Sequence, residues 1–118
     1  MTSSFARLAA GTFVAASMAF STQALAADPI EGNWRTESGE KAAISKCGGS
    51  FCIKLTTSQH AGKTIGRLKG GNGKYAGTIT DPSDDKKYSG SASVRGSSMK
   101  LKGCALKIFC KTQSWKKL

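Results

Sequence analysis

Short stretches in which apolar and polar residues alternate follow one another from about residue 32 to the end of the chain. In the stretch 98–102, Met99 and Leu101 alternate with Lys100 and Lys102. Residues two apart share a face of a β-strand, whereas a helix repeats every ~3.6 residues. The pattern therefore predicts eight short strands, at about 32–37, 41–47, 50–56, 64–69, 74–80, 86–95, 98–104 and 108–117.

Turn residues separate these predicted strands, and only the connection 57–63 is long. Gly70-Gly71-Asn72-Gly73 accepts the positive φ angles of a tight hairpin, and Asp81-Pro82 places proline where a type I turn prefers it. Short links join sequential antiparallel strands, and closing the sheet removes its exposed edges. We therefore predict an all-β fold, a small antiparallel meander barrel of about eight strands.

The alternation also assigns residues to the barrel interior. Gly77, Gly90 and Ala92 share the inward side and would leave it thinly filled. An eight-stranded barrel is either filled by side chains or holds one small ligand, and the pattern leaves both open. The inward residues are Trp34, Ile44, Phe51, Ile53, Leu55, Leu68, Tyr75, Ile79, Tyr88, Val94, Met99 and Leu101. The candidates to line or cap a ligand site are Trp34, Tyr75, Tyr88, Met99 and Trp115.

Residues 1–26 have the pattern of a signal peptide. Arg7 precedes an apolar run from Leu8 to Phe20, and Ala24-Leu25-Ala26 offers small residues for cleavage after Ala26. The alternative is an uncleaved membrane anchor, which the short run disfavours. We predict an exported protein, periplasmic or secreted from a bacterium, with one domain over 27–118 and no transmembrane span after cleavage.

The cysteines form two close pairs. In an oxidising compartment this spacing predicts two local disulfides, Cys47–Cys52 and Cys104–Cys110. Four cysteines allow three pairings, and the local pairing needs no long-range geometry. Four cysteines can also bind zinc, but spacings of four and five intervening residues in an exported chain fit a zinc site poorly. We expect neither a metal nor a cofactor.

The chain is strongly basic, with 18 Lys and Arg against 7 Asp and Glu, and a net charge of +11. Removing Arg7 with the signal peptide leaves +10. Such a surface favours anionic partners. Export argues against nucleic acid and leaves lipopolysaccharide, acidic lipids or acidic wall polymers. The alternative is that the lysines simply solvate the outer faces of strands.

Catalytic residues are not evident. His60 is the only histidine and lies in the long connection, with no acidic residue nearby in sequence. Asp81, Asp84 and Asp85 form the only acidic cluster and fit turn and loop positions better than a calcium loop. An enzyme would need one of these acids to converge with Tyr88 or His60. We therefore expect no catalytic residues and a protein that is not an enzyme.

Several motifs in order resemble a known family. Gly32-Asn33-Trp34 opens the first strand, Tyr75-Ala76-Gly77-Thr78-Ile79 leads into Asp81-Pro82, and the chain ends with Gln113-Ser114-Trp115. This order resembles the bacterial family called domain of unknown function 2147, which is similar to exported lipocalin-like barrels. The resemblance implies that Trp34 closes one barrel end against Lys116 or Lys117. It supplies no reaction and no catalytic residues.

These observations favour a monomeric, non-enzymatic binding protein. Its ligand would be a small apolar molecule in the interior or an anionic envelope component on the basic surface. Two alternatives remain: a protein inhibitor of a hydrolase, and a structural or stress protein of the envelope.

Overall fold

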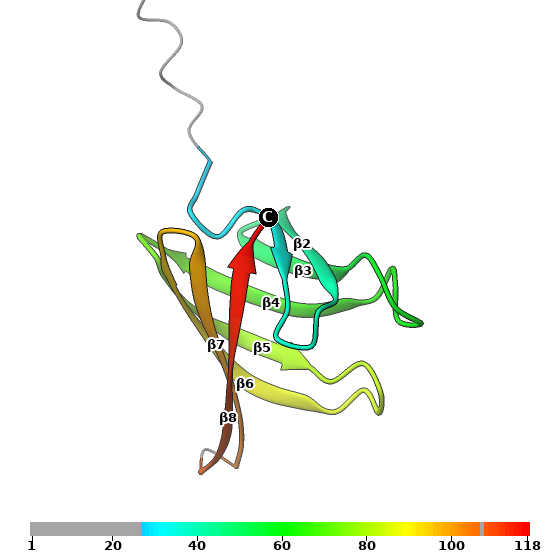
Figure 1. The fold of residues 1–118 in the computed structure, drawn as a ribbon. Helices are drawn as coiled ribbons and strands as arrows, with labels where there is room; N and C mark the ends of the chain where they lie inside the picture. Colours follow the sequence, from blue (N-terminus) through cyan, green and yellow to red (C-terminus); the bar gives the residue numbers. More distant parts are fainter. Residues whose placement is uncertain (1–26, 107) are drawn as a thin grey trace, which may run out of the picture.

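The computed structural model describes residues 27–106 and 108–118, and the predicted signal peptide lies outside the described residues. Eight strands form the domain (Figure 1). They are β1 (Gly32–Arg35), β2 (Lys41–Cys47), β3 (Ser50–Leu55), β4 (Thr64–Gly71), β5 (Lys74–Thr80), β6 (Lys87–Arg95), β7 (Ser98–Ala105) and β8 (Phe109–Lys117).

Each strand pairs antiparallel with the next, and β1 pairs with β8 to close a barrel. This confirms the predicted all-β meander. β1 ends earlier than predicted because Thr36 begins a turn, in which the Gly39 amide donates to the Thr36 carbonyl at 3.0 Å. β4 runs on to Gly71, which pairs with Lys74. Within the described residues, no helix is long and apolar enough to cross a membrane.

The barrel interior is packed over much of its length. Nine of the twelve residues assigned inward are buried, while Tyr88, Ile79 and Val94 are half-buried. Gly90 and Ala92 are buried as expected, but the space beside Gly90 is not empty. A side chain at Gly90 would collide with Ile79, so Ile79 fills the gap that the glycine leaves. Burial of such side chains is the main stabilising contribution to a small domain.

Gly77 has buried partners on both sides, as its inward assignment predicts, but is itself exposed. It pairs with Leu68 of β4 and with Gly90 of β6. A Cβ atom at this position would overlap the carbonyl oxygen of Arg67 and the Cα atom of Leu68. The missing side chain therefore allows β4 and β5 to approach closely where the sheet coils, a use of glycine that closed barrels commonly require.

A β-bulge explains a core residue that alternation misses. The register between β3 and β4 shifts at Ile53 and Lys54, which pair with Gly66 and Thr64, respectively. The extra residue, Ile65, is buried at 7% exposure although it has the opposite parity to the buried Leu68. A bulge inserts one residue and re-aims a side chain, so a strict two-residue period fails there.

Both predicted disulfides are present, one on each of two hairpins. Cys104 and Cys110 lie directly opposite each other, with Cα atoms 4.0 Å apart. Cys47 lies opposite Ser50, so its bond to Cys52 runs diagonally across the hairpin, with Cα atoms 5.8 Å apart.

The segment before β1 closes one end of the barrel. Ile30 and Trp34 are fully buried there, and the Trp34 indole N–H donates to the Ile30 carbonyl at 2.9 Å. The Lys117 ammonium lies 5.2 Å from the centre of the Trp34 ring and donates to the Pro29 carbonyl at 2.9 Å. The Trp34 closure is thus confirmed, with Lys117 rather than Lys116 as the basic partner. We call residues 28–31 the plug.

The plug also holds Tyr75, whose hydroxyl donates to the Asp28 carboxylate. Burial, followed by this hydrogen bond, raises the pKa of Tyr75 from 10.0 to about 12. Because the folded state holds this proton more tightly, its contribution to stability is complete below pH ~10 and is lost as pH rises towards ~12.

We expect the Tyr75 phenol to titrate near pH 12. The chain has two tyrosines, so Tyr88→Phe leaves Tyr75 as the only phenol, and ultraviolet absorbance follows its ionisation. The difference in unfolding free energy between wild type and Tyr75→Phe should narrow between pH ~10 and ~12. Because both proteins contain the same lysines, the titration of lysines cancels in this difference. A midpoint at pH 10 would contradict the buried hydrogen bond.

Candidate ligand-binding mouth

The end of the barrel opposite the plug is open. A cleft of about 730 Å³ lies there, between β4, the β5–β6 connection and the hairpin of β7 and β8. An adjoining hollow of about 540 Å³ reaches towards the β1–β2 and β3–β4 connections. The two share Ile65, Pro82, Gln113 and Trp115, so they form one opening, which we call the mouth.

Trp115 forms the floor of the mouth. It is 2% exposed and lies opposite Met99 in the β7–β8 register, which turns its ring inward. The indole N–H donates to the Gln113 side-chain carbonyl at 2.9 Å, which satisfies its polar group and fixes its orientation. The walls above this floor are mainly apolar, and the side chains that form them include Ile65, Ile79, Tyr88 and Leu101.

The five candidate ligand residues divide between the two ends of the barrel. Tyr88 and Trp115 line the mouth. Trp34 belongs to the plugged end, where its hydrogen bond and its ring contacts are already made. Tyr75 is 4% exposed and packs edge-on against Phe51, with ring centroids 5.6 Å apart. Met99 is 1% exposed in the packed core. Trp34, Tyr75 and Met99 therefore do not line the mouth.

The polar groups around the mouth serve mainly the turns. The Asp81 carboxylate accepts hydrogen bonds from the Ser83 hydroxyl at 2.6 Å and from the Ser83 amide at 2.9 Å. These bonds lower the pKa of Asp81. Asp84 accepts from the Lys86 amide at 3.0 Å, and Asp85 forms an exposed ion pair with Lys63 at 3.5 Å. Asp81 is therefore a turn-capping carboxylate.

His60 lies in the hollow beside Pro82, Gln113 and Trp115. Its side-chain Nε2 atom is 3.4 Å from the Gln59 amide nitrogen. Among residues 27–106 and 108–118, no three His, Cys, Asp or Glu side chains gather closely enough to hold a metal ion. The mouth thus offers shape and apolar contact, and its carboxylate at Asp81 is already hydrogen-bonded.

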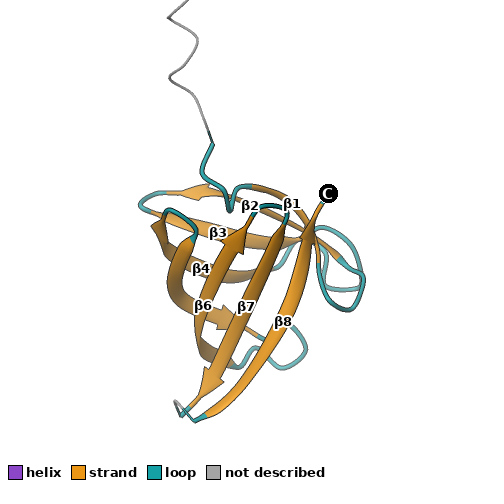
Figure 2. Ribbon diagram, turned by 60° about the vertical axis from the view of Figure 1, so that its left-hand side comes forward, coloured by secondary structure: helices purple, strands orange, loops and turns teal. Residues whose placement is uncertain are grey.

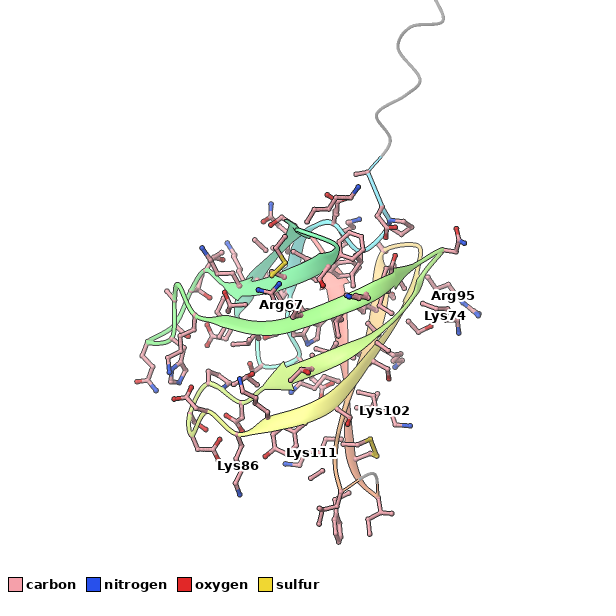
Figure 3. All side chains as sticks on the ribbon, turned by 180° about the vertical axis from the view of Figure 1, so that it is seen from behind. Arg67, Lys74, Lys86, Arg95, Lys102 and Lys111 are labelled. Carbon is pink, nitrogen blue, oxygen red and sulfur yellow. A yellow bond between two sulfur atoms is a disulfide. The ribbon has the colours of Figure 1, made fainter. Side chains whose placement is uncertain are left out.

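The outer wall of the barrel has a single sign of charge. The eight strands contain 14 Lys and Arg residues and no Asp or Glu. All seven acids lie in the plug or in the β1–β2 and β5–β6 connections: Asp28, Glu31, Glu37, Glu40, Asp81, Asp84 and Asp85. Figure 3 labels basic side chains on this wall, among them Arg67, Lys74 and Lys102, whereas Lys111 lines the mouth. Uniform charge on the strands creates a positive field across the wall.

Sequence alternation misses the tip of the β7–β8 hairpin, where Leu106 and Ile108 are 82% and 74% exposed. Alternation ends at a turn, so it assigns no face to Leu106, and the predicted last strand begins at Ile108, one residue before β8 does. A signal was nevertheless available: Leu, Ile and Phe replace the Gly, Asn and Asp that turns usually contain.

Residues 59–117 match the model of a family described as an uncharacterized protein conserved in bacteria, domain of unknown function 2147. The chain belongs to this family. The match begins in the β3–β4 connection and includes β4 to β8, which contribute most of the mouth, whereas the plug lies before it. No curated protein and no solved structure matches the chain.

Proposed function

We propose that this protein is an exported, non-enzymatic binding protein whose mouth takes a small apolar molecule. The observation that carries the proposal is the apolar cleft of about 730 Å³ above the ordered Trp115 floor. Ligand sites in proteins are typically clefts of ~300–1,000 Å³ with mostly apolar walls and a few polar groups. Gln113 and Lys111 supply such polar groups here.

Two further features support this proposal. The disulfides are appropriate to an oxidising compartment such as the periplasm, in agreement with the signal-peptide pattern of residues 1–26. The Asp81 carboxylate accepts hydrogen bonds from Ser83, and Asp84 and Asp85 are exposed, which supports a structural role for these acids.

A variant that fills the mouth tests the proposal. Gly103 lines the cleft, and a Cβ atom there would make only an ordinary contact of 3.7 Å with Tyr88. Gly103→Leu therefore places an apolar side chain in the mouth. We expect wild type to bind the neutral apolar probe N-phenyl-1-naphthylamine with enhanced fluorescence, and Gly103→Leu to weaken this binding at least ~10-fold, since the added side chain occupies ligand volume.

Gly49→Leu is the matched control. Gly49 lies in the β2–β3 turn, and a Cβ atom there meets nothing within 4 Å. This variant should bind the probe as wild type does. Equal loss in both variants, or no probe binding by wild type together with no co-purified small molecule in native mass spectra, would refute a ligand-binding mouth.

A second candidate function is contact with an anionic envelope component. The observation that favours it is the restriction of the strand charges to Lys and Arg. Binding of this kind weakens as salt screens the charges.

A further inference from the structure

We propose that the tip of the β7–β8 hairpin inserts into an anionic lipid membrane and directs the mouth towards it. The proposal rests on the second candidate function and adds the site and the partner. We call Leu106, Ile108 and Phe109 the tip.

The tip collects most of the exposed large apolar side chains. Leu106, Ile108 and Phe109 are 82%, 74% and 66% exposed, and the fourth such residue among those described, Leu118, lies at the plugged end. Scattered exposed apolar residues are ordinary, whereas a concentrated group marks an interaction surface. Figure 2 shows the hairpin of β7 and β8 projecting beyond the other connections at this end.

The hairpin is cross-linked at the base of the tip. The Cys104–Cys110 disulfide joins its two strands directly beneath the last pair, Ala105 and Phe109. The Ile108 amide donates to the Ala105 carbonyl at 3.2 Å and closes the turn. A braced turn loses little conformational entropy when it inserts, so more of the apolar contact appears as affinity.

The charges behind the tip suit an anionic surface. β7 and β8 contain five lysines and no acid, and Lys102 and Lys111 are the nearest of these to the tip. Lys102 is three residues from Ala105, or about 10 Å along the strand, close enough for headgroups to meet the lysine while the tip enters the acyl region. The acids at this end lie on neighbouring connections rather than on the hairpin: Asp81, Asp84 and Asp85 in the β5–β6 connection, and Glu37, which accepts from the Ser114 amide at 2.7 Å, in the β1–β2 connection.

A membrane fits the tip better than a protein partner does. Three side chains on one turn are far fewer than the ~20–30 residues per side of a stable protein interface. Binding at a membrane surface grows with the apolar area buried and with the attraction of nearby Lys or Arg to anionic lipids, so it requires no extended complementary surface. Ala105, Ile108 and Phe109 also line the cleft, so the apolar surface runs from the tip into the mouth.

Vesicle binding tests the proposal. Wild type should bind vesicles of equal parts phosphatidylcholine and phosphatidylglycerol, and high salt should weaken this binding. The variant Leu106→Ser/Ile108→Ser/Phe109→Ser should bind at least ~10-fold more weakly, because it removes three insertable side chains. Lys102→Gln/Lys111→Gln should lose ~10-fold or more at low salt. Leu118→Ser, the matched control at the opposite end, should change affinity less than about twofold.

A fluorescent reporter at the tip measures whether the tip enters the acyl region of the membrane. Relative to wild type, which already emits from Trp34 and Trp115, Phe109→Trp should add an emission component that shifts to shorter wavelengths on vesicles and is quenched by lipids brominated on their acyl chains. Salt-sensitive binding that survives in the triple serine variant would overturn the tip proposal and would assign membrane binding to the basic outer wall of the barrel. Absence of wild-type binding would overturn both. Self-association of wild type that the triple variant abolishes, without vesicle binding, would assign the tip to a second copy and also overturn the proposal.

Discussion

Replacing Trp34 with alanine is expected to lower the free energy of unfolding by about 3–5 kcal/mol, the usual cost of truncating a buried Trp or Phe. Trp34 is fully buried at the plugged end. The substitution removes the ring beneath Lys117 and the donor to the Ile30 carbonyl. Because domains of this kind are stable by only ~5–15 kcal/mol, the loss would be a large part of the total. Urea unfolding followed by circular dichroism measures it.

Trp34→Phe is the control. It retains an aromatic ring beneath Lys117 and removes only the indole N–H and part of the volume, so its cost should be distinctly smaller than that of Trp34→Ala. An alanine variant within about 1 kcal/mol of wild type would show that Trp34 does not organise the plugged end.

Gly77→Ala has the second largest expected effect, a loss of about 3 kcal/mol, although it adds a single methyl group. The added carbon would overlap the Arg67 carbonyl oxygen, which belongs to the backbone and cannot rotate away. Either β4 and β5 separate locally or the sheet flattens at this point. Urea unfolding should show the lower midpoint, and hydrogen exchange should show faster exchange at amides of the β4–β5 ladder.

Gly103→Ala is the matched comparison on β7. Its added carbon would lie 3.7 Å from the Tyr88 Cβ atom, an ordinary contact. Replacing glycine at a compatible site stabilises by ~0.4–1 kcal/mol through the unfolded chain, so this variant should equal or exceed wild type in stability. Similar losses of stability in Gly77→Ala and Gly103→Ala would mean that the close approach of β4 and β5 is not the reason for glycine at position 77.

The strand pattern predicts the barrel because each strand has one face in the core and one in water. In β7 the lysines alternate with Met99 and Leu101, so only one orientation of the strand buries the apolar side chains. The structure has this orientation, with Lys100 and Lys102 exposed. Ile65 departs from the strand pattern in parity, and Gly77 departs from it in being exposed. The first depends on a bulge and the second on a close approach between neighbouring strands, and both are set by the curvature of the closed sheet rather than by local sequence.

The plug and the mouth were harder to predict for a related reason. Ile30 precedes the first strand, so alternation gives it no face, yet it is fully buried. Its carbonyl accepts a hydrogen bond from the Trp34 indole, and its amide donates to the Asp28 carboxylate. Tyr88 and Trp115 were identified as candidate ligand residues, but so were Tyr75 and Met99, which fill the core. Parity separates inside from outside and cannot tell a packed end of a barrel from an open one.

The closing contact between β1 and β8 has a consequence for the order of assembly. Every other strand pairs with its sequence neighbour, whereas this seam joins Trp34 to Lys117 and Arg35 to Lys116. Bringing such distant positions together costs loop entropy, and two residue pairs return little for it. Lys117 also bonds to Pro29, and the Leu118 amide donates to the Asn33 carbonyl at 2.9 Å. The plug thus adds contacts to the two residue pairs of the seam, and deleting it should favour opening of the barrel between β1 and β8.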